Sequence, residues 1–574
     1  MANQTQDLDG TTVSTLIVAA EAQGSVVTCD EGLSFWGGVD PKSGSIIDAH
    51  HPQFGACLAG RMVLMPTSRG SCSGSGVLLE LAMKGLAPAA LVFREPEDVL
   101  TLGALVASEM FDCSLAVLRL SAVDYETLAQ ADQAAISGQS LWVGETAMPL
   151  TQITPSDLKL TASDKAILDG ANGPAAQIAM EILCAMASSQ GAEELLDVTR
   201  AHIDGCIYAS PANLVFAEAM ADRGGQVVVP TTMNAISVDR DNWQTQQVPH
   251  DFGLAASRLA DAYVRMGAQP TFTCAPYQSE DRPEAGEDIG WSESNAVIYA
   301  NSVLGARSVK HPDFLDLFIA LTGRAPASGV YLDENRRAEV VIDVEMPTQY
   351  DESFWPLLGW IAGHKSPDRI HLLRGLEEAS PSTDDLRAFC ASFGTTSAAP
   401  MFHMAGVTPE SELPIKADPK TDTITIEDFR QAWKSLNSAP DAIDLVALGS
   451  PHFSLAETRA FAREMAGQTV HSDTAVIITL SRATKAQADA EGLLASLEQS
   501  GAQVVCDLCW CSISEPVFPP KARTVMTNSG KYAHYGPGLS GRLVRFGSLS
   551  DCARAAVTGL ADAGLPHWLD QQSN

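Results

Sequence analysis

The sequence predicts an α/β protein with at least two domains, and three observations lead to this class. The chain has 574 residues, more than one compact core holds, because domains usually contain about 100–200 residues. Short β-rich apolar runs alternate with longer segments of helical character, as expected for strands covered by helices. Hydrophobic residues make up 45% and charged residues 19%, values typical of a globular protein rather than a fibrous or disordered one.

An N-terminal α/β domain is predicted over residues 1–148. Strands are expected at 12–19, 60–66, 89–93 and 115–120, and helices at 76–84 and 97–110. Gly85 is the expected stop of the first helix. Turn residues without periodicity, including Pro149 and Pro155, predict a linker over 149–163.

A large α/β domain is predicted over residues 164–574. Expected helices span 175–188 and 455–465, and expected strands span 226–229, 340–344, 445–448 and 475–480. The strands are short, apolar and separated by helices, which favours a mostly parallel sheet covered on both faces.

The charge and cysteine content narrow the class of partner. Lys plus Arg number 37 and Asp plus Glu 70, for a formal charge of −33. Such a chain repels phosphate backbones and anionic lipid, so no nucleic-acid or membrane partner is expected. The polar, acidic start lacks the features of a signal peptide, and no apolar run reaches about 18 residues. Twelve scattered cysteines then favour a cytoplasmic protein with free thiols or metal ligands.

A loop of small residues, 67–75, connects an expected strand to an expected helix. It contains Arg69, Gly70, Ser71 and Ser73. The helix N-terminus and Arg69 can bind an anion, and Ser71, held among N–H donors, can act as a base. A flexible Ser/Gly turn is equally compatible with the composition. No Walker lysine is present, which argues against a nucleotide loop.

Two cysteine segments are candidate metal ligands. Cys274 lies in a loop bounded by Pro276, and Cys506, Cys509 and Cys511 form overlapping Cys-x-x-Cys and Cys-x-Cys patterns. Thiolates at such spacing can hold iron or a cluster. The same residues are also compatible with buried apolar packing or, for the second segment, a redox dithiol.

Three further segments collect polar residues at the expected ends of elements, where loops carry function. They are 449–454, 527–535 and 291–307. Each is weak evidence alone, since polar loops are common.

Taken together, these segments resemble the aconitase X family, a divergent branch of the aconitase superfamily, over nearly the whole chain. The resemblance rests on ordered matches at 35–40, 60–82, 229–234, 273–278, 293–296, 301–307, 402–410 and 527–535. It implies a small swivelling β/α domain fused to a large multi-layer α/β domain, and a hydro-lyase activity. Archaeal relatives with two separate chains dehydrate mevalonate 5-phosphate, whereas fused bacterial relatives dehydrate cis-3-hydroxy-L-proline to Δ1-pyrroline-2-carboxylate. The fusion here favours the second substrate.

The resemblance also implies an iron–sulfur cluster, [2Fe-2S] or [4Fe-4S], or iron alone. The family's ligand positions fall at Cys274, residue 450 and Cys509, but residue 450 is Ser450 here. Serine is a poorer iron ligand than thiolate, so Cys511 or Cys506 is a candidate third ligand beside Ser450. Cys390 and Cys113 are weaker candidates.

The expected roles follow from the chemistry of dehydration. Iron polarises the hydroxyl as a Lewis acid, and Ser71 removes the α-proton. Arg69 and Arg307 bind the carboxylate, and Lys531 pairs with it or activates Ser71. The candidates that protonate the departing hydroxide are His403, His452 and Glu293. Further substrate contacts are expected from Gly70, Ser73, Asn295, Asn528 and Ser529, with the small domain closing over the large one.

Three alternatives remain open at this point. The chain could dehydrate or isomerise another hydroxy acid, such as mevalonate 5-phosphate. It could be a non-catalytic regulatory protein that carries a cluster. It could also be a cluster-free module that binds an amino acid.

Overall fold

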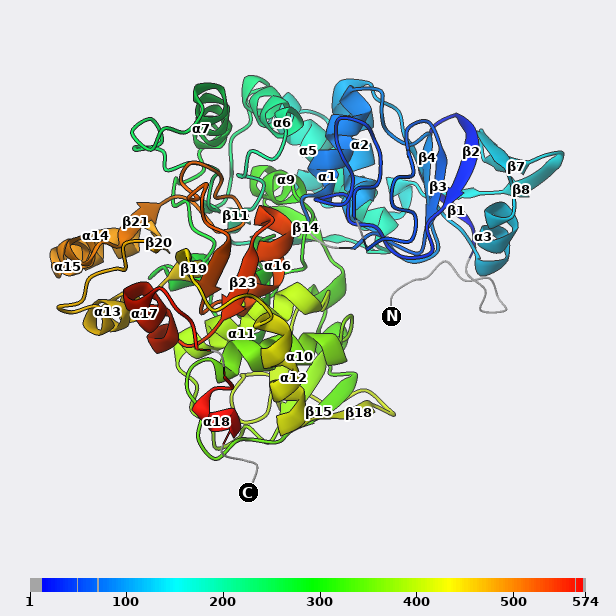
Figure 1. Cartoon of the computed structure of the whole chain (residues 1–574). Coiled ribbons are helices and arrows are strands. Elements are labelled where there is room, and N and C mark those ends of the chain that lie inside the picture. The colour runs from blue at the N-terminus through cyan, green and yellow to red at the C-terminus, as the bar shows by residue number, and fades with distance from the viewer. Residues whose placement is uncertain (1–12, 49, 70–71, 563, 571–574) are drawn as a thin grey trace.

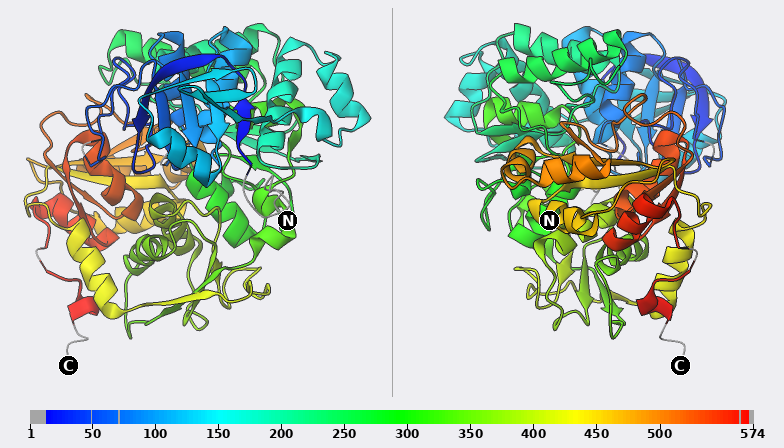
Figure 2. Two further views of the ribbon diagram at one scale, coloured as in Figure 1. Left: turned by 90° about the vertical axis from the view of Figure 1, so that its right-hand side faces the viewer. Right: turned by 60° about the vertical axis from the view of Figure 1, so that its left-hand side comes forward.

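The structure is a computed structural model that describes residues 13–48, 50–69, 72–562 and 564–570. An N-terminal domain, residues 13–152, lies beside a larger body that contains the rest of the chain (Figure 1). In both views of Figure 2 the blue N-terminal elements lie next to the cyan and green ones, and the yellow-green strands lie at the opposite end. The predicted fold class is confirmed.

A nine-stranded mixed sheet forms the N-terminal domain, in the order β8-β7-β6-β2-β3-β4-β5-β1-β9. Its strands β3, β4 and β5 are buried along their whole length, as strands covered on both faces are. Its elements are β1 (Thr15–Val18), β2 (Ala22–Thr28), β3 (Met62–Met65), α1 (Gly74–Met83), β4 (Ala90–Phe93), α2 (Val99–Phe111), β5 (Ala116–Arg119), α3 (Ala122–Ala129), β6 (Gln133–Ser137), β7 (Ser140–Val143), β8 (Thr146–Pro149) and β9 (Thr151–Gln152).

The segment that follows, residues 153–326, contains the helices that contact the N-terminal domain. Within the predicted linker 149–163 the structure places β9, the 3-10 turn η1 (Pro155–Asp157) and the start of α4. The later elements are α4 (Ala162–Leu168), α5 (Pro174–Ser189), β10 (Leu195–Asp197), β11 (Ala201–Ile203), α6 (Pro211–Asp222), β12 (Thr231–Met233), α7 (His250–Arg265), η2 (Pro276–Gln278), β13 (Gly290–Trp291), α8 (Ser294–Tyr299), the π-helical turn η3 (Ala300–Leu304), α9 (Leu315–Thr322) and β14 (Arg324–Pro326).

Two more parallel sheets complete the large body. The first, in the order β17-β16-β15-β18, and the second, in the order β21-β20-β19-β22-β23, are each covered by helices. Their elements are η4 (Gly329–Tyr331), η5 (Asp333–Arg336), β15 (Val340–Val344), α10 (Phe354–Lys365), β16 (His371–Arg374), α11 (Thr383–Thr396), β17 (His403–Met404), β18 (Lys420–Ile424), α12 (Ile426–Leu436), β19 (Leu445–Phe453), α13 (Leu455–Glu464), β20 (Ala475–Leu480), α14 (Arg482–Ala490), α15 (Leu493–Ser500), β21 (Gln503–Cys506), β22 (Thr524–Thr527), α16 (Gly530–Ser540), β23 (Leu543–Phe546), α17 (Leu549–Thr558) and α18 (His567–Asp570).

The prediction of one mostly parallel sheet in the large domain was therefore too simple, because the parallel strands are divided among three sheets. The predicted buried strand at 226–229 is also wrong. Val227 and Val228 donate their backbone N–H groups to Met266 and Ala320 carbonyls, and Val228 is 56% exposed. The strand begins after Pro230, as β12, and pairs with β11.

The N-terminal domain packs on the large body through α1 and α2. Glu80 of α1 is buried and accepts the backbone N–H of Ala212, at the start of α6, at 2.8 Å. Gly76 lies so close to α6 that a Cβ atom there would come within 2.8 Å of the Asn213 side chain, so a larger residue would displace that side chain. No helix among the described residues is long and apolar enough to cross a membrane.

The fully buried Arg336 connects two parts of the large body. Its guanidinium pairs with Glu410 at 2.6 Å. It also donates to the carbonyls of Val330, Asn301 and Ala306 at 2.9–3.2 Å. A buried cation with this many acceptors is well compensated, so removing it leaves several orphaned acceptors.

Arg336→Met is expected to lower the free energy of unfolding by about 3–5 kcal/mol, because Glu410 and the three carbonyls lose their donor. Urea denaturation at pH 7 measures the loss. Arg258→Met is the matched control: Arg258 pairs with Glu218 at the surface, and its loss should cost less than about 1 kcal/mol. Equal losses in both variants would contradict this account of Arg336.

Candidate functional site

Three thiols meet in the interior, and they are called here the three-thiol cluster: Cys274, Cys509 and Cys511. Cys274 lies in the loop between α7 and η2, and the other two lie in the loop after β21. Together with Ala235 they form one contact group. The sulfur of Cys274 accepts the backbone N–H of His452, and that of Cys509 accepts the N–H of Cys511, both at 3.4 Å. Backbone donors aimed at sulfur favour thiolate over thiol, as a metal ligand requires.

The thiols influence one another strongly. A hydrogen bond with Cys274 raises the pKa of Cys509 to about 12, while Cys511 and Lys531 act in the opposite sense. The pKa of Cys511 is raised well above its usual value by its hydrogen bond with Cys509 and by burial. Three thiolates this close together would need a compensating cation, and the ammonium of Lys531 is one such charge.

Lys531 and Glu293 form a buried ion pair beside the thiols, with Nζ and Oε1 2.8 Å apart. Burial opposes the charge of Lys531, but Glu293 and the three thiols outweigh it and hold the pKa of Lys531 well above its usual value. Burial likewise opposes the charge of Glu293, but Lys531 holds the pKa of that carboxyl below its usual value. The pair is therefore an ammonium and a carboxylate at neutral pH.

Two helix N-termini position this pair. Lys531 lies in the first turn of α16, whose N-cap Ser529 accepts the N–H of Tyr532. Glu293 is the N-cap of α8 and accepts the N–H of Ala296 at 2.9 Å. Asn295 donates to Glu293 and to the carbonyl of Cys274, which connects the ion pair to the thiols.

Ser450, at the fourth candidate ligand position, lies near the end of β19. Its hydroxyl is buried and has no hydrogen-bond partner among the described residues. Its carbonyl accepts the hydroxyl of Ser529, and both residues line a small cavity with Asn528. A buried hydroxyl without a hydrogen-bond partner is unusual, and it leaves Ser450 able to serve as an additional metal ligand.

The structure also brings together residues that sequence reasoning missed. The acidic cluster is Asp204, Asp313 and Asp316. Cys72 of the 67–75 loop donates its thiol to Asp204 at 3.0 Å, and ligating atoms of Cys72, Asp204 and Asp313 lie within 4.8 Å of one another. Asp204 directly follows β11, and a polar residue at the carboxyl end of a buried parallel strand is the one signal that could have found it.

Lys310 is a second, partly buried cation that was missed. Its ammonium donates to the carbonyl of Ser397 at 3.2 Å. Burial lowers the pKa of Lys310 to about 8, although Cys72 and Glu293 partly offset this effect. The interactions with Cys72 and Glu293 place Lys310 between the 67–75 loop and the ion pair.

The 67–75 loop is described at 67–69 and 72–75, and the predicted Gly70 and Ser71 lie outside the described residues. Arg69 pairs with Glu31 and Asp48 at 3.1 and 3.4 Å, so it is held within its own domain. Ser73 hydrogen-bonds Asp313, which partly offsets the rise in the pKa of that carboxyl on burial.

Other predicted site residues have partners elsewhere. Nε2 of His403 forms a hydrogen bond of 2.6 Å with the backbone carbonyl of Arg336. Arg307 donates to Asp333 and to the carbonyl of Tyr331. His452 is buried with Nε2 2.6 Å from the carbonyl of Leu508, and burial lowers its pKa to about 4. His403 and Arg307 thus have structural partners, and among the described residues neither of them contacts the thiols or the ion pair.

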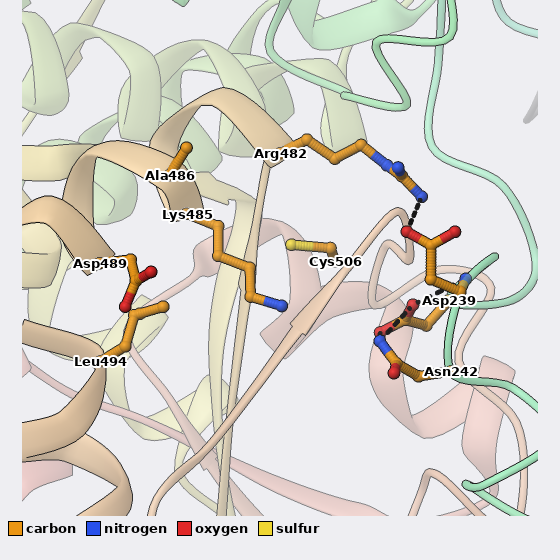
Figure 3. Close-up of a pocket in the computed structure, with 9 residues that line it drawn as sticks. Asp239, Asn242, Arg482, Lys485, Ala486, Asp489, Leu494 and Cys506 are labelled. Atoms are coloured by element: carbon orange, nitrogen blue, oxygen red, sulfur yellow. Dashed lines mark hydrogen bonds and ion pairs between the residues drawn. The ribbon is translucent and has the colours of Figure 1, made fainter.

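Of the other cysteines considered, Cys506 lies in a separate pocket with Lys485, Arg482, Asp239 and Asn242 (Figure 3). Cys390 is fully buried in α11 among apolar side chains. Cys113 hydrogen-bonds the carbonyl of Phe111 in the N-terminal domain. Among the described residues, Cys511 rather than these three joins Cys274 and Cys509.

Lys531→Met is expected to lower the free energy of unfolding of the metal-free protein by about 3–5 kcal/mol at pH 7, because Glu293 stays buried without its partner. Urea denaturation checks this value. The penalty should shrink as the pH falls toward 4, since an unpaired buried carboxylate has a raised pKa and relaxes when protonated.

The control for this prediction is a double-mutant cycle. Lys531→Met combined with Glu293→Gln should cost less than the sum of the two single changes, since the double variant leaves no unpaired charge. Additive costs would show that the two residues are independent.

Comparison with known families covers most of the chain. The family models for aconitase X match as follows: the swivel domain at 11–143, the first domain at 157–334, the second domain at 338–434 and the third domain at 443–558. In the three-thiol cluster, Cys274 comes from the first domain and Cys509 and Cys511 come from the third domain. Cys72 of the swivel domain contacts Asp204 of the acidic cluster.

Individual proteins are also similar to this chain over most of its length. The chain is 49% identical to a cis-3-hydroxy-L-proline dehydratase of Pseudomonas aeruginosa, over 97% of this chain and 98% of that one. It is 46% identical to a protein of the same name from Hypocrea jecorina, over 97% and 96%. The solved aconitase X of Thermococcus kodakaraensis in its holo-form has 31% identity and a TM-score of 0.64, covering 70% of this chain and 100% of that one. The chain belongs to the aconitase X family.

Proposed function

We propose that this protein is a hydro-lyase that dehydrates cis-3-hydroxy-L-proline to Δ1-pyrroline-2-carboxylate. The observation that carries the proposal is the buried three-thiol cluster beside the Lys531–Glu293 pair. The full-length similarity to two proteins named cis-3-hydroxy-L-proline dehydratase supports the choice of substrate.

The donor set fits an iron–sulfur cluster or an iron ion. Cys274, Cys509 and Cys511 would hold it, with Ser450 as a possible further ligand through its orphaned hydroxyl. Backbone N–H groups already donate to two of the sulfurs, as is common around iron–sulfur centres. When bound, such a group supplies a Lewis acid for a substrate hydroxyl.

The residues of the chain would then divide the remaining work. Lys531 offers a buried ammonium to the substrate carboxylate, and Asn295 and Glu293 fix its position. We propose Ser71 as the base that removes the α-proton, the role that its place in the 67–75 loop suggests. Arg69, Ser73, Asn528 and Ser529 stay candidates for contacts made when the two domains close.

The Lys531–Glu293 pair also bears on the proton balance. Glu293 is a carboxylate at neutral pH, so it is better suited to hold Lys531 than to act as an acid. The proton for the departing hydroxide would then come from Nζ of Lys531 or from Nζ of Lys310. The pKa of Lys310, about 8, suits a general acid. Loss of the α-proton and of hydroxide gives an enamine that tautomerises to the cyclic imine.

The proposed ligand set predicts the iron content of variants. Cys274→Ser, Cys509→Ser and Cys511→Ser should each lose most of the iron and sulfide found after anaerobic purification, and with it turnover of cis-3-hydroxy-L-proline. Ser450→Ala should lose less, because a hydroxyl is the weaker ligand. Cys184→Ser is the control, since Cys184 is buried in a different apolar cluster. Iron retained in all three thiol variants would refute the ligand set.

The assignment of the base predicts the behaviour of Ser71→Ala. Turnover should fall by about 10²–10⁴-fold, the usual contribution of a positioned base. Exchange of the substrate α-hydrogen with deuterated solvent should fall in parallel, while iron content stays unchanged. Ser43→Ala, on an exposed turn of the same domain, should match the wild type. Full exchange in Ser71→Ala would exclude Ser71 as the base.

A further inference from the structure

The acidic cluster gathers three carboxyl groups that the contacts described above do not pair with a cation. Within the described ranges, no ion pair connects Asp204, Asp313 or Asp316 to a Lys, Arg or His. Burial raises the pKa of Asp204 to about 6 and that of Asp316 to about 7. Buried carboxylates of this kind must either take up a proton or meet a cation.

The three carboxylates differ in what they still lack. Asp316 is satisfied, since it accepts the backbone N–H groups of Asp204 and Leu317 at 2.6 and 2.7 Å. Asp204 accepts the amide of Asn234 and the thiol of Cys72. Asp313 is 2% exposed, yet its Oδ1 atom has no hydrogen-bond partner among the described residues. This orphaned oxygen marks where a donor is missing.

A donor to the free oxygen of Asp313 would approach beside Cys72, whose sulfur already hydrogen-bonds both Asp204 and Asp313. Their ligating oxygens lie within 4.8 Å of each other, so an atom between them can make hydrogen bonds of about 2.8 Å to both. Cys72 is a less suitable metal ligand here than it first appears, because its sulfur donates to Asp204 and therefore carries its proton. A small cation with two N–H donors could therefore contact one oxygen of each carboxyl next to this thiol.

We propose that Asp204 and Asp313 form the subsite for the protonated ring nitrogen of a zwitterionic cyclic α-amino acid. A secondary ammonium has two N–H donors, one for each carboxylate, and charge-assisted hydrogen bonds of this kind are the strong ones. The inference rests on the proposed function, because it assigns the amino group of that substrate.

The subsite complements the cation on the other side of the site. Asp204 interacts electrostatically with both Glu293 and Lys531, so the acidic cluster and the ion pair belong to one charged region. A substrate carboxylate at Lys531 would place an adjacent ammonium toward Asp204. Cys72 brings the 67–75 loop of the N-terminal domain to the same point, so this contact depends on the two domains lying together.

Binding of two matched ligands tests the subsite without relying on turnover. L-Proline carries the ring ammonium, and cyclopentanecarboxylate has the same ring and carboxylate without it. Calorimetric titration of the wild type, as anaerobically purified, should show L-proline binding at least about 10-fold more tightly. In Asp313→Asn the affinity for L-proline should fall about 10- to 100-fold, while that for cyclopentanecarboxylate changes less than about 2-fold.

Two further variants keep the test decisive. Asp204→Asn should shift the same preference and serves if Asp313→Asn does not fold. Asp288→Asn is the matched control, because Asp288 also has an unpartnered Oδ1 and a pKa raised by burial, but belongs to neither cluster. It should bind both ligands as the wild type does.

Several outcomes would overturn the proposal. An equal loss of both ligands in Asp313→Asn, or no preference for L-proline in the wild type, would exclude an ammonium subsite. A divalent metal retained in stoichiometric amount by the Cys509→Ser variant, and lost when Asp313→Asn is added, would assign the cluster to that metal instead. Turnover of cis-3-hydroxy-L-proline by the wild type is measured separately, so absent turnover with an intact ligand preference would refute the proposed function and leave the subsite standing.

Discussion

The buried ammonium of Lys531 is the interaction on which the arrangement of the site depends. It lies beside Glu293 and acts on all three thiols of the three-thiol cluster. Without it, a carboxylate and three ionisable sulfurs would share a dry interior, at a cost of several kcal/mol for each uncompensated charge. Glu293 in turn caps α8, and Lys531 lies in the first turn of α16. The ion pair that balances these charges therefore also holds the N-termini of the two helices together.

The site is assembled from distant parts of the chain because each part ends at the same place. Asp204 follows β11, Cys274 lies in the loop between α7 and η2, and Ser450 lies near the end of β19. β11 and β19 belong to different parallel sheets, and each carries its polar residue at or near its carboxyl end, where ligands bind in such sheets. The N-terminal domain adds Cys72 from a loop that precedes α1, and Gly76 and Glu80 hold α1 against α6.

Much of the fold could be predicted from the sequence, since helices such as α5 and strands such as β15 and β20 have strong local patterns. The apolar run at 226–229 misled because tertiary hydrogen bonds to Met266 and Ala320, absent from any local pattern, decided its conformation. Cys274 and Cys509 were nominated by their positions in a family resemblance, and Cys511 by the Cys-x-Cys spacing and as a replacement for the ligand position that Ser450 occupies. The Lys531–Glu293 pair joins residues 238 positions apart, so the two could be nominated singly but not as a pair. Asp204 and Asp313 were missed because a single aspartate after a strand or before a helix looks the same in sequence whether it faces water or a buried site.

The close contact among the thiols has a consequence for the protein before it acquires metal. Sulfurs that hydrogen-bond to one another are already near the partners with which they would form a disulfide. Loss of two electrons from any pair would remove two of the three proposed ligands in one event. The raised pKa of Cys509 and Cys511 slows that reaction, because thiolate rather than thiol is the reactive form. The high pKa values that make metal loading depend on the loss of protons therefore also protect the metal-free cluster against oxidation.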